Sequence, residues 1–234
     1  MLPILHQDAH LIAIDKPAGL LVHRTGLDTG ETRFAVQLLR DQIGQPVWPL
    51  HRLDKGTSGV LLFALSAQVA GAVSSLFESN EGIAMTYRAV VRGWPPAEGV
   101  IDHPLTRLAD DARATARALT VQPARTRFRT LARLSLPLAY GPFAETRCAL
   151  LELRPETGRR HQLRRHCKHM AHPIIGDATH GKGPLNRALA EWLGLQRLWL
   201  HALSLELAHP WTGQHLRIEA PPGSEWRRWP GLEG

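Results

Sequence analysis

The stretch "HRLDKGTSGVLLFA", residues 51–64, carries the clearest sign of how the chain folds. A basic pair, His51 and Arg52, precedes a single carboxylate, Asp54. A glycine-rich turn comes next, and glycine permits backbone geometry that other residues resist. The apolar run at residues 60–64 then predicts a buried strand. The stretch therefore predicts one acid in a shaped, basic turn directly before a rigid core element.

Two interpretations of Asp54 fit these residues. An aspartate in an exposed loop usually caps a neighbouring backbone group or only improves solubility. An aspartate held next to an arginine instead stays ionised and is available as a nucleophile. The cations that surround Asp54, here and further along the chain, favour the second interpretation.

The composition indicates a basic globular protein. The 234 residues contain 28 Lys and Arg against 21 Asp and Glu, a net charge of +7, and 44% of them are hydrophobic. The excess of positive charge favours a polyanionic partner, although many basic proteins bind nothing acidic. The apolar runs are far shorter than a membrane helix needs, and the N-terminus does not resemble a secretory signal. The only cysteines, Cys148 and Cys167, fit free thiols in a reducing compartment, so we expect a cytoplasmic protein.

Short strand-like runs dominate the chain. They lie at residues 11–14, 60–65, 87–91, 128–134, 149–153, 198–207 and 216–218. Helical periodicity is visible in three segments, at residues 67–79, 161–171 and 186–193. Because strands outnumber helices and do not alternate with them strictly, we expect an α+β fold with a large mixed, mostly antiparallel sheet flanked by helices. The polar segment Ala109 to Arg127 is the best candidate for an exposed insertion.

A second basic segment, "TGRRHQLRRHCKHMAHP", spans residues 157–173. It contains five cations within ten residues, namely Arg159, Arg160, Arg164, Arg165 and Lys168. On a helix across this segment, Arg165 and Lys168 share a more exposed side, and Arg164 lies between that side and an apolar stripe. A solvated basic helix would have this composition. A helix that binds phosphates, with one arginine turned inward to meet a carboxylate, would have it too.

Four histidines and one cysteine also cluster in this segment and raise the question of a metal site. The cluster has no Cys-x-x-Cys and no His-Glu-x-x-His spacing, and adjacent arginines would repel a divalent cation. No glycine-rich phosphate loop is present either, since "GKGPLN" at residues 181–186 lacks the required spacing. We therefore expect no metal and no organic cofactor.

Tyr87, in "TYRAVVRG" at residues 86–93, is one of only two tyrosines. A tyrosine in a strand is most often a core residue whose hydroxyl is satisfied. The nearby Arg88 and Arg92 fit a different role, a platform on which a nucleic-acid base stacks. Both interpretations remain open on these residues alone.

Taken in order, these motifs resemble the pseudouridine synthases of the large family that modifies ribosomal and transfer RNA. The matching pieces are "DKPAGLLVH" (15–23), "HRLDKGTSGVLLFA" (51–64), "YRAVVRG" (87–93), "ETGRRHQLRRHCKHMAHPIIGD" (156–177) and "LWLHA" (198–202). The second and fourth pieces are highly specific, and the match runs from Ile4 to about Pro221. The resemblance implies the catalytic fold of that family and an isomerase that converts uridine to pseudouridine in RNA without a cofactor.

The resemblance also implies roles for individual residues. Asp54 becomes the catalytic nucleophile, and Arg164 becomes the arginine paired with its carboxylate. Tyr87 becomes the tyrosine that stacks on the target base and handles a proton. Arg52 resembles the residue that helps to displace the target base, and Leu200 resembles an apolar residue of the pocket.

Further residues follow from the same resemblance. Contacts to the RNA are expected from four more basic residues, His51, Arg160, Arg165 and Lys168. Lys16 and Pro17 resemble a motif that buttresses the site. The chain departs from the pattern at Met85, where a lysine commonly stands, so one supporting contact is not expected in its usual form.

The local resemblance at residues 157–202 favours the subgroup that acts on uridine 65 of transfer RNA. A sibling acting on ribosomal RNA or on another position of transfer RNA is the alternative. A non-catalytic RNA-binding protein on the same fold is disfavoured, because Asp54, Tyr87 and Arg164 are all present. The residues leave open whether Asp54 attacks the sugar or the base. We expect one catalytic domain across residues 1–234, no N-terminal accessory RNA-binding domain, no membrane contact and no obligate protein partner.

Overall fold

A computed structural model describes residues 1–24, 30–79, 82–107 and 120–232. Within them, the large sheet has the order β1-β2-β4-β11-β5-β10-β9-β6, with β12 added on β11 and β3 added on β4. Its strands are β1 Ile4–Gln7, β2 Leu11–Lys16, β3 Trp48–Pro49, β4 Ser58–Ala64, β5 Ile83–Arg92, β6 Glu98–Asp102, β9 Arg125–Leu136, β10 Thr146–Pro155, β11 Leu200–Ala208 and β12 His215–Glu219. A separate two-stranded sheet pairs β7 Leu105–Thr106 with β8 Val121–Gln122.

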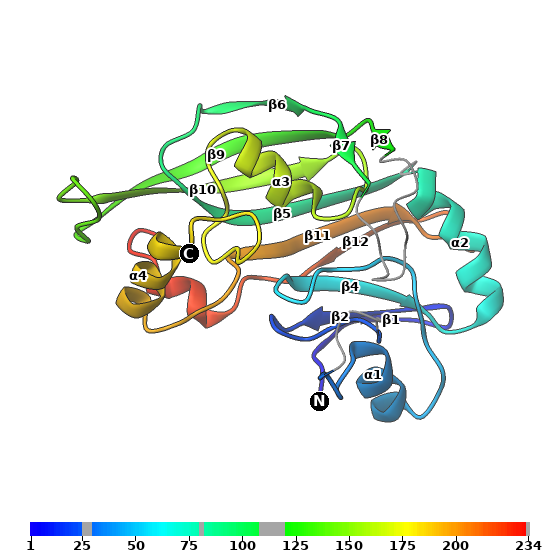
Figure 1. Ribbon diagram of the computed structural model, residues 1–234. Coiled ribbons are helices and arrows are strands. Elements are labelled where there is room, and N and C mark those ends of the chain that lie inside the picture. The colour runs from blue at the N-terminus through cyan, green and yellow to red at the C-terminus, as the bar shows by residue number, and fades with distance from the viewer. Residues whose placement is uncertain (25–29, 80–81, 108–119, 233–234) are drawn as a thin grey trace.

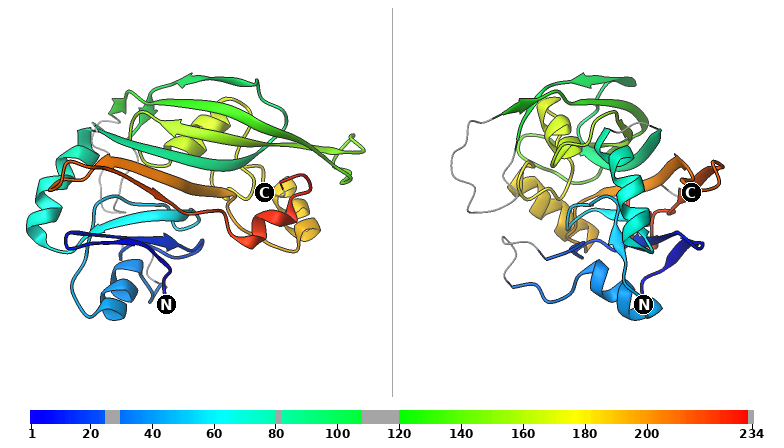
Figure 2. Two further views of the ribbon diagram at one scale, coloured as in Figure 1. Left: turned by 180° about the vertical axis from the view of Figure 1, so that it is seen from behind. Right: turned by 90° about the vertical axis from the view of Figure 1, so that its right-hand side faces the viewer.

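Helices lie against this twisted sheet, with α1 at the β1–β2 edge and α3 against the β5–β10 region (Figures 1 and 2). The helices are α1 Ala35–Ile43, α2 Ala67–Ser79, α3 Gln162–His169, α4 Gly183–Leu193 and the 3-10 helix η1 Ser224–Arg228. Among the described strands, β4 and β11 form the only parallel pair, and all other pairs are antiparallel. The predicted α+β fold with a mostly antiparallel sheet is confirmed.

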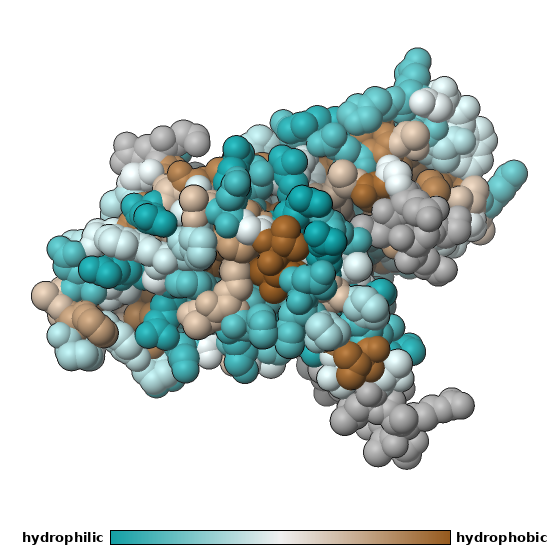
Figure 3. Space-filling view, turned by 90° about the horizontal axis from the view of Figure 1, so that it is seen from above, coloured by the Kyte–Doolittle hydropathy of each residue, from teal (hydrophilic) through white to brown (hydrophobic). Residues whose placement is uncertain are grey.

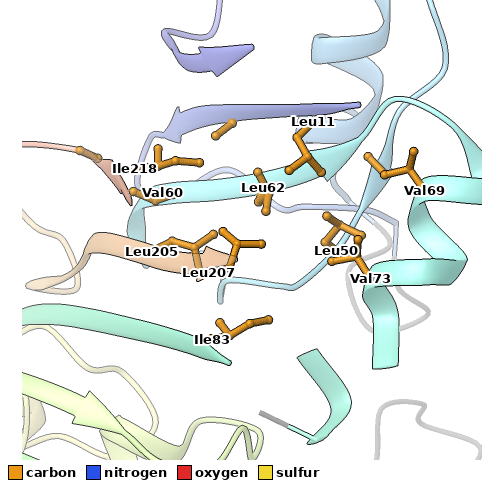
Figure 4. Close-up of a cluster of buried hydrophobic side chains, with 13 residues drawn as sticks. Leu11, Leu50, Val60, Leu62, Val69, Val73, Ile83, Leu205, Leu207 and Ile218 are labelled. Atoms are coloured by element: carbon orange, nitrogen blue, oxygen red, sulfur yellow. The ribbon is translucent and has the colours of Figure 1, made fainter. Parts of the chain in front are cut away.

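Strand β4 passes through the middle of the core. All of its residues are buried, as its apolar run predicts. Val60 and Leu62 point into a cluster between α2, β2 and β11 (Figure 4). Leu61 and Phe63 pack in the opposite direction, toward α1, because successive side chains of a strand alternate between its faces. Truncating Leu62 to alanine would remove about 2–5 kcal/mol of stability, so the strand is a firm base for the turn that precedes it.

Strand β5 shows the same alternation. Ala89 and Val91 pack with residues of α3, whereas Val90 joins a cluster that contains α4 and C-terminal tryptophans. Tyr87 packs against both the α3 cluster and the cluster beneath α1. It therefore lies where the two halves of the sheet meet.

The parallel contact between β4 and β11 joins these halves. Its register pairs Ser58 with His201 and Gly59 with Ala202. Gly59 has a φ of +108°, and a Cβ atom there would lie 2.1 Å from the Ala202 carbonyl oxygen. The position requires glycine both for its backbone conformation and for the close approach of β11.

The three predicted helices are present, but the predicted stripe of α4 is wrong at one position. The apolar stripe of residues 186–193 consists of Leu189, Trp192 and Leu193, which predicts a buried Trp192, but Trp192 is 36% exposed. Leu185 takes its place beside Leu189 and Leu193. The helix begins at Gly183, earlier than predicted, and its core face repeats every four residues from Leu185 onward.

The predicted insertion at residues 109–127 is only partly described, since residues 109–119 lie outside the described part of the chain. Val121 and Gln122 form β8, and residues 125–127 begin β9 in the large sheet. Val121 lies outside the large sheet and is 58% exposed. For residues 125–127, which belong to the large sheet, the prediction of an insertion is wrong. Exposed arginines alternate there with buried residues such as Thr126, so a half-buried strand has the composition of a polar loop.

Two expectations from composition bear on the surface and on the thiols. Cys148 and Cys167 are both buried free thiols, as predicted. Among the described residues, no helix has the length and apolar character needed to cross a membrane. The face in Figure 3 is mostly hydrophilic, with small separate hydrophobic patches.

Candidate active site

Asp54 lies in the connection from β3 to β4, just before the buried strand begins. Its carbonyl oxygen accepts the Thr57 N–H at 3.0 Å, which closes the turn. A Cβ atom on Gly56 would lie 2.9 Å from the Leu198 Cβ, so the turn also needs a small residue there. The Asp54 side chain is 24% exposed and can be reached from solvent.

Arg164, on α3, bridges two carboxylates. Its Nη1 donates to Asp54 Oδ2 at 2.9 Å. Its Nε and Nη2 donate to the two carboxylate oxygens of Asp177 at 2.7 and 2.8 Å. The bidentate pair fixes the plane of the guanidinium and turns its remaining edge toward Asp54. The inward arginine of the basic helix is therefore Arg164, as the sequence predicts.

Arg164 and its two carboxylates, Asp54 and Asp177, favour one another's charged forms. Burial disfavours the charged form of Arg164, but Asp177 and Asp54 outweigh this effect and raise the pKa of Arg164. Burial also acts to raise the pKa of Asp177, but hydrogen bonds from Arg164 and from the backbone of His180 and Thr179 bring that pKa below its ordinary value. Arg164 and Asp177 therefore stay ionised at neutral pH.

Sequence reasoning assigned no role to Asp177. Its side chain is fully buried, and its Oδ1 accepts the N–H groups of Thr179 and His180 at 2.9 Å each. The preceding Gly176 has a φ of +79°, and a Cβ there would collide with the Arg197 carbonyl oxygen. The available signal was the single acid at the end of "PIIGD", the only carboxylate in the basic segment after Glu156.

His161 flanks Asp54. Its Nε2 is 3.7 Å from Asp54 Oδ1, and its Nδ1 shares a hydrogen bond of 3.1 Å with His180 Nε2. Burial lowers the pKa of His161 to about 4, although the charge of Asp54 acts in the opposite direction. At neutral pH His161 is therefore uncharged. It also has a left-handed backbone with a φ of 55°, which costs about 1–2 kcal/mol in a residue with a side chain.

Lys16 supports the turn that carries Asp54. Its side chain is buried, and its Nζ donates to the carbonyl oxygens of Pro17, Leu20 and Lys55 at 2.9, 2.7 and 3.3 Å. Burial lowers the pKa of Lys16 to about 7, with the charge of Asp54 opposing the shift. The bonds tie the segment after β2 to the residue next to Asp54, which is the geometry expected of a buttress.

A cavity of about 570 Å³ opens beside Asp54, within the size range of small-molecule sites. Tyr87, Leu200 and Met85 line it together with Asp54 and Arg164. The Tyr87 hydroxyl donates to Met85 Sδ at 3.5 Å, so the departure at Met85 places a thioether, and not an ammonium group, beside Tyr87. Burial raises the pKa of Tyr87, and the charge of Asp54 raises it further. The phenol is therefore protonated at neutral pH.

A second depression of about 790 Å³ adjoins this cavity, and Asp54 and Arg164 are among the residues that line both. Lys55 and Arg197 belong to the lining of the second depression. Asp54 is therefore placed between a cavity with an apolar wall and a depression with a basic one.

The remaining predicted RNA-binding residues divide into two groups. Arg52 is exposed, and both Arg52 and Arg160 line the two cavities beside Asp54. Lys168 is exposed and Arg165 is half-buried, but neither lines either of these cavities. The structure brings the first pair together with Asp54 and leaves the second pair further along α3.

His51 makes contacts that stabilise the fold. Its Nε2 accepts the Leu62 N–H at 3.1 Å, and its ring stacks on Phe77 with 5.2 Å between centroids. Burial lowers the pKa of His51 to about 4. The ring also lines the cavity of about 570 Å³, so a contact to RNA would come from a neutral histidine.

The other histidines of the basic segment make internal contacts. His166 bonds to the Thr126 hydroxyl and to the His103 carbonyl oxygen, and the His169 ring stacks on the His103 ring at 3.7 Å. Within the described ranges, no group of three or more His, Cys, Asp or Glu residues has an arrangement that could hold a metal ion.

Known proteins resemble this chain in sequence and in fold. Residues 10–169 match the family described as RNA pseudouridylate synthase. The chain is 50% identical over 229 residues to "tRNA pseudouridine synthase C" of Vibrio cholerae, covering 97% of this chain and 93% of that protein. The protein of the same name from Salmonella typhimurium is 46% identical over 242 residues, covering 99% of this chain and 92% of that protein.

Solved structures agree with the sequence comparison. "Human RNA Pseudouridylate Synthase Domain Containing 4" has a TM-score of 0.68 at 28% identity, covering 97% of this chain and 92% of that one. "Human RNA Pseudouridylate Synthase Domain Containing 1" shares the fold, with a TM-score of 0.73 at 23% identity over 95% of this chain and 84% of that one. The chain therefore belongs to the RNA pseudouridylate synthase family and is an isomerase that makes pseudouridine in RNA.

Proposed function

We propose that the chain converts uridine 65 of transfer RNA to pseudouridine, with Asp54 as the nucleophile. The observation that carries the proposal is the placement of the Asp54 carboxylate. Arg164 holds it at 2.9 Å, Asp177 holds Arg164 in turn, and the group lies at a cavity that also contains Tyr87 and Leu200.

The reaction breaks the bond between ribose C1′ and uracil N1 and joins C1′ to C5. Uracil loses the hydrogen at C5 and gains one at N1, so the composition of the nucleotide does not change. Arg164 bonds to Oδ2 of Asp54, which leaves Oδ1 for the attack on the sugar or on the base. A covalent intermediate formed in this way divides one difficult rearrangement into easier steps.

Tyr87 and Leu200 are the side chains that we assign to the uracil ring. Both line the cavity next to Asp54, and an aromatic face stacks on any base. Because the pKa of Tyr87 is raised, its hydroxyl donates a hydrogen bond and is a weak base in the free enzyme. It handles a proton only by passing its own proton on, so stacking is its main role in the proposal.

Arg52 is assigned to the extrusion of the target nucleotide. Taking a base out of its stack costs a few kcal/mol. Arg52 is exposed and lines both cavities beside Asp54, where it can occupy the gap that the uridine leaves. This contact offsets part of the cost of extrusion.

The choice of transfer RNA is supported by the names of the relatives, which are "tRNA pseudouridine synthase C" in both bacteria. Position 65 is supported by the local resemblance at residues 157–202. A uridine of ribosomal RNA, or another position of transfer RNA, would use the same catalytic group.

The test is to incubate the purified protein with unmodified tRNA transcripts and with protein-free rRNA, and to map pseudouridine in both. We expect the product at position 65 of a tRNA, and none when that uridine is replaced by cytidine. Product confined to rRNA or to another tRNA position would reject the proposed substrate. Product formed by pure Asp54→Asn protein would reject the proposed nucleophile.

A further inference from the structure

A third cavity, of about 300 Å³, lies next to the catalytic cavity. The described residues that line it are Thr106, Arg107, Gln122, Gly158, Arg159, Arg160 and Arg165. Four of these residues are arginines, and no acidic side chain of the described residues lines the cavity. Gly158, Arg159 and Arg160 also line the cavity that contains Tyr87, so the two cavities share a wall. We call this third cavity the arginine pocket.

Two arginines of the pocket are held in place by backbone carbonyl groups. Arg159 Nε donates to the Pro123 oxygen at 3.0 Å, and Arg165 Nη1 donates to the Thr106 oxygen at 2.9 Å. A guanidinium has five N–H donors, and a carbonyl oxygen occupies one without neutralising the charge. These bonds therefore orient two positive groups and leave donors for a further acceptor.

Arg159 and Arg165 bond to carbonyl groups within the described part of the chain, whereas other arginines of the surface pair with acids. Arg127 pairs with Glu156, and Arg217 pairs with Glu206 and Glu219. In the pocket, Arg165 is half-buried, and this burial lowers the pKa of its guanidinium below the ordinary value. Fixed guanidinium groups of this kind suit a phosphate, because the planar N–H donors match its oxygens in pairs.

We propose that the arginine pocket binds a backbone phosphate of the substrate RNA, close to the nucleotide that enters the Tyr87 cavity. This inference rests on the proposed function, because it requires an RNA whose uridine occupies that cavity. An aromatic ring such as Tyr87 stacks on any base, so stacking alone does not determine which nucleotide of the RNA strand enters the cavity. A backbone phosphate held at a fixed point does determine it. The pocket therefore positions the strand so that the correct nucleotide reaches Asp54.

The test compares Arg107→Gln and Arg159→Gln with a control, Arg40→Gln. Arg40 is exposed on α1 and pairs with Asp41, so the control removes the same charge away from the pocket. At about 0.1 M salt, each pocket variant should bind tRNA about three- to tenfold more weakly, and its salt slope should fall by about one. The control should change both quantities less. Thermal unfolding should show that all three variants are folded.

A second measurement identifies the contact. A tRNA with one neutral methylphosphonate, placed in turn at each phosphate near the target uridine, should lose affinity for the wild type at one position. Arg107→Gln should lose less affinity than the wild type at that position, because part of the contact is already gone. The proposal is overturned if the pocket variants bind like Arg40→Gln, or if no position gives this coupling.

Failure of the pocket is distinguishable from failure of the proposed function. If wild-type protein modifies a uridine other than position 65, the substrate proposal fails, and the same variants are compared on the RNA that is modified. If wild-type protein modifies position 65 and the pocket variants bind it like the control, only the pocket proposal fails. In single-turnover reactions at saturating RNA, Arg107→Gln should react more slowly than Arg40→Gln, because a strand that is no longer held in register presents the target uridine to Asp54 less often.

Discussion

Replacing Asp177 with asparagine is the most direct test of how the candidate site is held together. The substitution keeps the shape of the side chain and removes its charge. In the wild type, Oδ1 accepts from Arg164 Nη2 and from two backbone N–H groups, and Oδ2 accepts from Arg164 Nε. An asparagine that keeps its oxygen at the Oδ1 position must aim its NH₂ group at Nε, which places two donors face to face.

The magnitude follows from this geometry. Removing one partner of a buried ion pair costs about 3–5 kcal/mol. Arg164 keeps Asp54 as a partner, so we expect the free energy of unfolding to fall by about 3 kcal/mol, the low end of that range. Arg164 also loses one charge-assisted hydrogen bond that orients it, worth about 1.5–3 kcal/mol. If that orientation is needed in the transition state, the single-turnover rate falls about ten- to a hundredfold.

The assay measures three quantities on folded protein, well below its unfolding temperature. These are the single-turnover rate at saturating RNA, the Kd for RNA, and the free energy of unfolding in denaturant. Asp41→Asn is the control, because Asp41 is exposed and pairs with its neighbour Arg40. The control should leave all three quantities near their wild-type values, and Asp177→Asn should change the rate and the stability but leave the Kd within about threefold.

One result would refute the reasoning. If Asp177→Asn is less stable but reacts at the wild-type rate, Arg164 does not depend on Asp177 for its position. Asp177 would then be a structural residue alone. A rate loss without a change in Kd is the outcome that a merely structural role does not produce.

Other perturbations give further expected outcomes. Asp54→Asn should abolish pseudouridine formation while leaving RNA binding within about tenfold, because binding comes mainly from phosphate contacts; measurable product from the pure variant would contradict this. Arg164→Met should destroy turnover with a smaller effect on binding, whereas Lys168→Gln should weaken binding modestly and lower the salt slope by about one; equal behaviour of the two variants would contradict the inward and outward division. Tyr87→Phe should retain more activity than Tyr87→Ala if stacking is the main role, as single-turnover rates would show. Burial lowers the pKa of Lys16 from its ordinary value of 10.5 to about 7 in the folded protein. The unfolded state therefore binds more protons between these two values, and wild-type stability should rise with pH there relative to Lys16→Met. Activity should persist in excess chelator, and elemental analysis should find no stoichiometric zinc.

The parts of the site that the sequence predicts are those encoded by local patterns. The turn with Asp54 is recognisable because a glycine-rich connection and an apolar strand follow each other directly. Arg164 is recognisable because the helical stripe of residues 163, 167 and 170 turns one neighbouring arginine toward the core. In both cases the residues that reveal the feature lie close together in the sequence, in one turn and strand or on one helix.

Elements with weak patterns were not predicted. Helix α1 was missed although Ala35, Leu39 and Ile43 recur on one face. Phe34 before it makes no side-chain cap, so no start signal marks this short helix. The short strands β7 and β8 have two residues each, too few for a period to be visible. The carbonyl group that accepts from Arg165 belongs to β7. Because β7 was not predicted, Arg165 was expected on the exposed side of its helix, and it is half-buried in the fold.

Asp177 was missed for a different reason. Its role depends both on a tertiary contact and on the chemistry of the proposed reaction, and neither is visible in a local sequence pattern. In the proposed reaction, bond formation by Asp54 removes the negative charge from its carboxylate. An arginine paired with Asp54 alone would then be left buried without a partner, which is costly. Arg164 instead retains its bidentate pair with Asp177 throughout. Arg164 thus makes its bidentate pair with Asp177, which does not react, and a single hydrogen bond of 2.9 Å with Asp54, which reacts in the proposed mechanism. This unequal sharing lets Asp54 gain and lose a covalent bond without leaving an unpaired charge in the protein.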